Sequence, residues 1–109
     1  ICARGEAALR ETEAELKALG GAVHAAVCDL SDGDAVKAYV AQAAQALGGL
    51  DILVNNASGF GRSDDEAGWA LSLDVDLMAS VRASHTAIPL LSKGGSIVHV
   101  SSIPRIQAV

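Results

Sequence analysis

The chain has 109 residues, enough for one domain with a single hydrophobic core. Half of its residues are hydrophobic but only 3% are aromatic, so alanine, valine, leucine and isoleucine have to build that core. A net charge of −5 argues against nucleic-acid binding, because an acidic surface repels phosphate backbones. No uncharged apolar run approaches the roughly 18 residues of a membrane span, so we expect no membrane association and a cytoplasmic setting.

Short apolar stretches alternate with helical patterns along the chain. Apolar residues recur at helical spacing in three segments, and a pair of glycines follows each of them. The stretch from Leu50 to Val54 is a continuous apolar run apart from Asp51, as is typical of a parallel strand covered on both faces. In chain order we expect a strand end at 1–3, a helix at 7–19, a strand at 22–28, a helix at 33–47, a strand at 50–54, a helix at 66–91 and a strand at 96–100.

This order predicts the fold class. Strands joined by helices form parallel sheets with right-handed crossovers. We therefore expect an α/β fold, a doubly wound parallel sheet of the Rossmann type, whose ligands bind beyond the carboxyl ends of the strands. The first strand has nothing before it to pair with, and the chain stops in a loop. Residues 1–109 are thus expected to form a partial nucleotide-binding domain, incomplete at both ends.

The expected helix at 66–91 is apolar on two faces. Such a helix is buried twice, once against its own sheet and once against something else, and a second subunit is the natural candidate. One face carries Trp69, Leu73, Leu77 and Val81, and the other carries Leu71, Val75 and Met78.

The cysteines and histidines do not indicate a metal site. Cys2 and Cys28 match no metal-binding spacing, and a secreted disulfide scaffold would carry more cysteines. We expect both thiols to be reduced and buried. The three histidines are scattered, and His99, on an expected strand, is interpreted as packed rather than functional.

Four segments resemble motifs of the short-chain dehydrogenase/reductase family. Asp51–Ser58 (Asp-Ile-Leu-Val-Asn-Asn-Ala-Ser) resembles its strand-four motif, usually written Asn-Asn-Ala-Gly, and Cys28-Asp29-Leu30 resembles its strand-three acidic motif. Trp69, followed seven residues later by Asp76-Leu77, resembles the start of its long interface helix. Gly95–Ser102 resembles strand five. The order and spacing indicate an internal fragment, from strand two to just after strand five.

The resemblance implies a nicotinamide cofactor site. Asn56 and Ala57 would line the adenosine-ribose side of the cofactor, where small residues let the backbone approach closely. Ser58 stands where the family has glycine, which leaves the path of the loop open. Asp29 would accept a hydrogen bond from the adenine amino group, beside the backbone of Leu30. The alternative for Asp29 is a role at a helix N-terminus, since capping residues follow it.

Arg4 favours NADP over NAD. Folds that choose NAD usually place a carboxylate just after this strand to bind the ribose 2′-hydroxyl. Here an arginine follows the strand directly, and a guanidinium suits a 2′-phosphate through bidentate hydrogen bonds. The alternative is an ordinary exposed arginine.

Ser102 matches the family's catalytic serine, which orients the substrate carbonyl or hydroxyl. Ser101 is the alternative, although residues alternate in direction along a strand. In the family a tyrosine acts as general acid and base, with a lysine four residues later that lowers its pKa. That pair is absent here: Tyr39, the only tyrosine, is followed four residues later by Ala43 and fills a core position.

Asp76 departs from the family, which has asparagine in a helix kink that holds a water for proton relay. An ionised aspartate can accept a hydrogen bond from that water but cannot donate one. Either Asp76 works in the relay and changes the pH profile, or it marks an atypical member, or it faces solvent.

The leading hypothesis is therefore a fragment of an oxidoreductase that transfers a hydride between NADP(H) and a carbonyl or alcohol substrate, in a homotetramer or dimer. Alone it is expected to be inactive. The alternative is a non-catalytic nucleotide-binding or scaffold protein of the same fold. A receiver-like domain with Asp29 and Asp51 as an acidic pair is disfavoured, since Asp51 begins its strand. The substrate cannot be read from the sequence, although Phe60 and Arg62 lie in a loop that bears on specificity.

Overall fold

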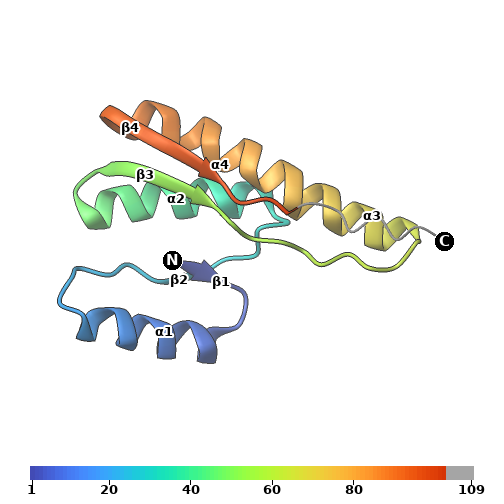
Figure 1. Ribbon diagram of the computed structural model, residues 1–109, viewed down its shortest axis with the longest axis horizontal. Coiled ribbons are helices and arrows are strands. Elements are labelled where there is room, and N and C mark those ends of the chain that lie inside the picture. The colour runs from blue at the N-terminus through green and yellow to red at the C-terminus, as the bar shows by residue number, and fades with distance from the viewer. Residues whose placement is uncertain (103–109) are drawn as a thin grey trace.

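The computed structural model describes residues 1–102, so residues 103–109 of the expected domain lie outside the described part. Helices and strands alternate as predicted (Figure 1). In chain order the elements are β1 (Cys2–Ala3), α1 (Glu6–Ala18), β2 (Ala26–Val27), α2 (Gly33–Leu47), β3 (Leu50–Asn55), α3 (Glu66–Ser72), a π-helical segment (Leu73–Met78), α4 (Ala79–Ala87), a 3₁₀ turn (Ile88–Leu90) and β4 (Leu91–His99).

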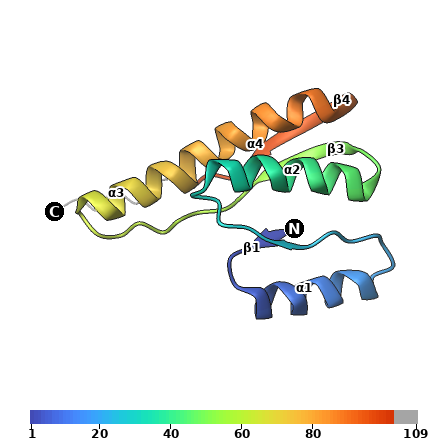
Figure 2. The same ribbon diagram turned by 180° about the vertical axis from the view of Figure 1, so that it is seen from behind.

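The strands pair in parallel, as the connecting helices predict. β1 pairs with β2 and β3 pairs with β4, so the described residues form two separate two-stranded sheets. The arrows of β1, β3 and β4 point the same way, and their carboxyl ends therefore share one side of the molecule (Figure 1). β1 and β2 lie between α1 and α2 in both views (Figure 2), an arrangement typical of a doubly wound fold. The predicted α/β, Rossmann-like class is confirmed.

Local signals define α2, whose predicted bounds of 33–47 are those observed. The carboxylate of Asp32 accepts hydrogen bonds from the backbone N–H groups of Asp34 and Ala35, at 3.0 and 3.2 Å. These two groups lack partners within the helix, so the cap stabilises its first turn. Gly48 ends the helix with a φ of 79°, a left-handed conformation that favours glycine.

The core lies between α2 and α4 and against β3. It is aliphatic, as the scarcity of aromatic residues predicts, and the alanines of α4 let the two helices approach closely. Val36 is 1% exposed and Ala87 is fully buried. The buried cluster consists of Val36, Val40, Ala79, Ala83 and Ala87, with Leu30, Tyr39, Leu50 and Leu53 packed around it.

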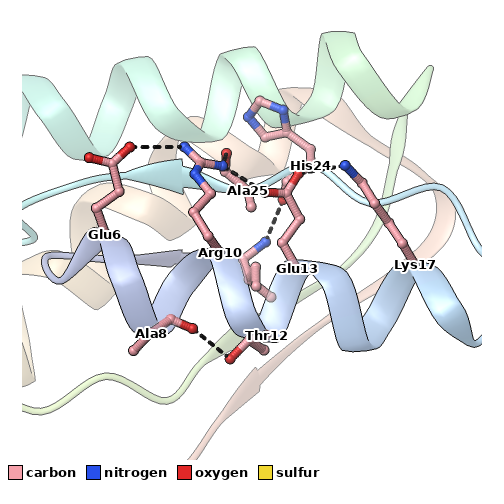
Figure 3. Close-up of polar contacts among 9 residues, drawn as sticks. Glu6, Ala8, Arg10, Thr12, Glu13, Lys17, His24 and Ala25 are labelled. Carbon is pink, nitrogen blue, oxygen red and sulfur yellow. Dashed lines mark hydrogen bonds and ion pairs between the residues drawn. The ribbon is translucent and has the colours of Figure 1, made fainter.

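A network of ion pairs runs along α1 (Figure 3). Glu13 accepts hydrogen bonds from Lys17 at 2.8 Å and from Arg10 at 2.7 Å, and these bonds lower its pKa to about 2. Arg10 also donates to the backbone carbonyl of Ala25 at 3.3 Å. That contact joins α1 to the segment that leads into β2, whereas the exposed ion pairs themselves contribute little stability.

The predicted boundaries differ from the observed ones by more than one residue in three elements. The expected strand at 22–28 is reduced to Ala26–Val27, because its partner β1 has only two residues. The expected strand at 96–100 is instead Leu91–His99, with an irregular register near its start. The expected helix at 66–91 contains a π-helical segment and leaves α-helical geometry after Ala87, where Pro89 has no N–H to donate.

The long helix buries one of its two apolar faces. Val75 is 8% exposed and lies on the face that packs against the rest of the chain. Trp69, Leu73 and Leu77, on the other face, are 61%, 52% and 52% exposed. The expected packing of one face against the chain's own fold is confirmed. The other face, which was expected to pack against a second subunit, is exposed to solvent in the single chain. Within residues 1–102, no helix has the length and apolar character needed to cross a membrane.

Candidate functional site

Five of the predicted site residues line one groove at the carboxyl ends of β3 and β4. The groove measures about 760 Å³ and is bounded by α4 on one side; we call it the serine groove. Its walls carry both polar groups and apolar side chains. The predicted residues that it brings together are Asn56, Ala57, Ser58, Asp76 and Ser102.

A second groove, of about 510 Å³, runs between β1 and β3, and we call it the central groove. Aliphatic side chains from α2, β3 and α4 contribute much of its lining. Leu30 lies in its wall, and Asn56 and Ala57 line it as well as the serine groove. The segment after β3 therefore separates the serine groove from the central groove. A ligand bound at the carboxyl edge of the strands could contact this segment from either groove.

Arg4 and Asp29 follow the neighbouring strands β1 and β2. The N–H of Cys28 donates to the carbonyl of Ala3 at 3.0 Å, which holds the two strand ends side by side. Arg4 is exposed and lies close enough to Asp29 to favour its charged form. The two predicted cofactor-binding side chains thus share the edge of the β1–β2 sheet.

The carboxylate of Asp29 organises the turn that follows it. Its Oδ1 accepts hydrogen bonds from the hydroxyl of Ser31 at 2.7 Å and from the Ser31 N–H at 3.0 Å. These bonds, with a further contribution from Arg4, lower the pKa of Asp29, so it is ionised at neutral pH. Asp32 is the capping residue of α2, and Asp29 organises the turn that leads into this cap, so the structure contains the local role at the helix N-terminus that was the alternative for Asp29.

Asp76 lies in the π-helical segment, which coincides with the kink implied by the family resemblance. A π turn adds a residue to the helical turn and often accompanies a functional site. The Oδ2 atom of Asp76 accepts a hydrogen bond from the N–H of Gly59 at 3.4 Å. The aspartate therefore contacts the backbone of the loop after β3, a contact that its position in the sequence did not predict.

Ser58, which replaces the expected glycine, is accommodated in that loop. Its hydroxyl accepts a hydrogen bond from the N–H of Phe60 at 3.2 Å, so the side chain stabilises the turn that it enters. Gly59 packs tightly: a Cβ there would lie 2.9 Å from the Leu71 side chain.

A polar contact network that the sequence did not predict joins β3, α4 and β4. The side-chain amide of Asn55 donates to the Ser84 hydroxyl at 3.2 Å and lies 3.3 Å from Nδ1 of His99. The interpretation of His99 as packed is wrong: it is exposed and lines the serine groove with Ser102. Only the strand register, which pairs Asn55 with His99, brings these side chains together.

The thiols are free, as expected, and only one of them is buried. Cys28 is 5% exposed and Cys2 is half-buried. Burial, with help from nearby acidic groups, raises the pKa of Cys28 to about 11, so its thiol is neutral at pH 7. In the part of the chain that the structure describes, no three side chains of the metal-binding types converge on one point.

Comparison with known proteins gives a consistent result. The family model of the short-chain dehydrogenases matches residues 1–108. A hexahydroindene-carboxyl-CoA reductase of Mycobacterium tuberculosis is 39% identical over 90% of this chain and 40% of its own length. A metagenomic short-chain oxidoreductase in complex with NADP superposes with a TM-score of 0.85 at 32% identity, covering 99% of this chain and 52% of that one.

A second solved structure that resembles this chain contains NAD instead of NADP. A short-chain dehydrogenase/reductase from Burkholderia phymatum in complex with NAD has a TM-score of 0.78 at 28% identity, covering 90% of this chain and 37% of that one. The chain spans about two fifths of the length of the curated relatives it matches. Because the family model matches 108 of its 109 residues, this chain belongs to the short-chain dehydrogenase/reductase family.

Proposed function

We propose that the full-length protein is an oxidoreductase that transfers a hydride between NADP(H) and a carbonyl or alcohol substrate. The observation that carries the proposal is the convergence of Asn56, Ala57, Asp76 and Ser102 on the serine groove. This groove lies at the carboxyl edge of the strands, where doubly wound folds bind their ligands. The relatives support the same chemistry, since one is a hexahydroindene-carboxyl-CoA reductase and another is an oxidoreductase in complex with NADP.

Each side chain has a distinct role in this proposal. Ser102 donates a hydrogen bond to the substrate oxygen and orients the reacting carbon, while Asn56 and Ala57 form the wall beside the adenosine ribose. Asp29 accepts from the adenine amino group through Oδ2, because both of its observed hydrogen bonds engage Oδ1. The nicotinamide supplies or accepts the hydride when it is bound. No Tyr-x-x-x-Lys occurs in these 109 residues, so this chain alone is proposed to be inactive.

Arg4 is proposed to select NADP by binding its 2′-phosphate. In the full-length protein, Arg4→Ala is expected to raise the KM for NADPH by about 10- to 100-fold, the value of one lost charged hydrogen-bonding partner. The KM for NADH should change little, because NADH has only a hydroxyl at that position. Initial rates of NADPH and NADH oxidation with a carbonyl substrate measure both constants.

Lys93→Ala is the matched control for Arg4. It removes one exposed positive charge near the beginning of β4, at the edge opposite the proposed site, so it corrects for the change in net charge. Equal increases in KM for both cofactors would contradict the proposed contact with the 2′-phosphate. Failure of the full-length protein to oxidise either cofactor with any carbonyl compound would contradict the enzyme assignment itself.

The open face of the long helix is proposed to form a subunit interface. Trp69, Leu73 and Leu77 are all more than half exposed and lie along α3 and the π-helical segment. Burying three such side chains on a second copy gives the helix the second apolar contact that its pattern predicts. Light scattering of the full-length protein is expected to show a dimer or tetramer, and Leu73→Asp should shift it toward monomer. A monomeric parent protein would contradict the interface.

A non-catalytic nucleotide-binding protein is the second candidate, and Asp76 is the observation that favours it. Its carboxylate contacts the N–H of Gly59, a structural role that does not require proton transfer. Asp76→Asn separates the two candidates. In an enzyme this change should alter kcat, because Asp76 lines the same groove as Ser102. In a binding protein it should change nucleotide affinity alone.

A further inference from the structure

Phe60 has an unusual backbone conformation. Its φ is +51°, and it is the only non-glycine residue with a positive φ in residues 1–102. A bulky side chain is disfavoured in this left-handed region because Cβ crowds the backbone. Glycine would adopt this conformation without strain, so backbone geometry does not explain why phenylalanine occupies position 60.

Contacts on both sides of Phe60 maintain this conformation. On one side, Ser58 Oγ accepts from the Phe60 N–H at 3.2 Å and Asp76 Oδ2 accepts from the Gly59 N–H at 3.4 Å. On the other side, Gly61 lies so close to α3 that a Cβ there would be 2.3 Å from the carbonyl oxygen of Gly68. The loop is therefore held against the long helix, and Phe60 has little freedom to relax.

The phenyl ring of Phe60 is not buried by folding, so burial does not offset the backbone strain. It is 72% exposed, and it lies outside the buried cluster between α2 and α4. It lines the serine groove together with Leu77, Val100 and Ser102. The backbone strain thus presents an aromatic side chain to the groove rather than to the core.

We infer that Phe60 determines substrate specificity by covering an apolar, ring-bearing part of the substrate, while Ser102 orients the carbonyl. This inference rests on the proposed function of the serine groove. The flat face of a phenyl ring packs best against another ring or a flat hydrocarbon group, and the contact removes the exposed ring from water. The substrate class is therefore a ketone, or the corresponding alcohol, that carries an aromatic ring or another flat hydrocarbon group.

The first experiment uses Phe60→Gly in the full-length protein with its cofactor. Glycine relieves the positive φ, so the thermal unfolding midpoint should be equal to or higher than that of the wild type. The value of kcat/KM for acetophenone should fall at least about tenfold, whereas that for acetone should change little. Leu19→Ala, which shortens an 84% exposed side chain beyond the end of α1, should change neither the ratio of the two kcat/KM values nor the unfolding midpoint. Equal losses for both ketones, or a lower midpoint with unchanged discrimination, would overturn the inference.

A second measurement does not depend on turnover. Phe60→Trp is made in a Trp69→Phe background, so the indole at position 60 is the only tryptophan within residues 1–109, and the Trp69→Phe protein measured alone gives the signal of any other tryptophan. Acetophenone added in the presence of cofactor should change its fluorescence along a saturating curve. A saturating change without turnover would support the contact of Phe60 with an aromatic ketone and count against the proposed enzyme. A strictly linear change, typical of random collision, would overturn the contact whether or not turnover is seen.

Discussion

Replacing Ser102 by alanine in the full-length protein is expected to lower kcat by about 100- to 1,000-fold, the loss typical of one hydrogen-bond donor aimed at the reacting oxygen. Ser102 is exposed beyond β4 and lines the serine groove, as Asp76 does, so a substrate can reach it. Because Ser102 is proposed to act on the substrate rather than on the cofactor, the KM for NADPH should stay near its original value. Steady-state rates with saturating cofactor measure the effect.

Ser101 provides the matched control for this change. It is also exposed and also lines the serine groove, but successive residues of an extended segment point in opposite directions. Ser101→Ala should therefore leave most of the activity intact. If Ser101→Ala lost as much activity as Ser102→Ala, the family match would have assigned the catalytic role to the wrong serine. An active Ser102→Ala variant would contradict the proposed role altogether.

Gly68→Ala should lower the free energy of unfolding by about 1–3 kcal/mol, the usual cost of an extra methyl group in a packed site. A Cβ at Gly68 would lie 2.2 Å from the carbonyl oxygen of Ser63 and 2.5 Å from its hydroxyl. One of these atoms belongs to the backbone, so the loop itself would have to move. The effect opposes helix propensity, which favours alanine over glycine by about 1 kcal/mol inside a helix. Urea or thermal unfolding of the full-length protein gives the difference.

Gly21→Ala is the control, because nothing lies within 4 Å of a Cβ at that position and its φ is not in the left-handed region. It should be neutral or slightly stabilising, since alanine restricts the unfolded chain. A Gly68→Ala protein as stable as the wild type would show that the loop after β3 moves freely. The clamped geometry on which the role of Phe60 depends would then be contradicted as well.

Local signals made some elements predictable to the residue. Asp32 and Gly48 bound α2 from either end, through a side-chain cap and a left-handed C-terminus, and neither effect needs the rest of the fold. Strand lengths were less predictable, because a strand extends only as far as a hydrogen-bonded partner does. The expected strand at 22–28 was reduced to two residues for that reason, whereas pairing of Leu91 with Leu50 lengthened the last one.

The sequence by itself determined the family, the alternation of helices and strands, and the residue types at the carboxyl edge, because these depend on periodicity, capping and motifs read along the chain. Only the tertiary structure decided which of those residues meet. Asp76 meets Gly59, and His99 lies opposite Asn55, through contacts between segments distant in the sequence. The first of these contacts holds the loop in which Phe60 has its positive φ. Register and close packing create such contacts, and neither leaves a local pattern.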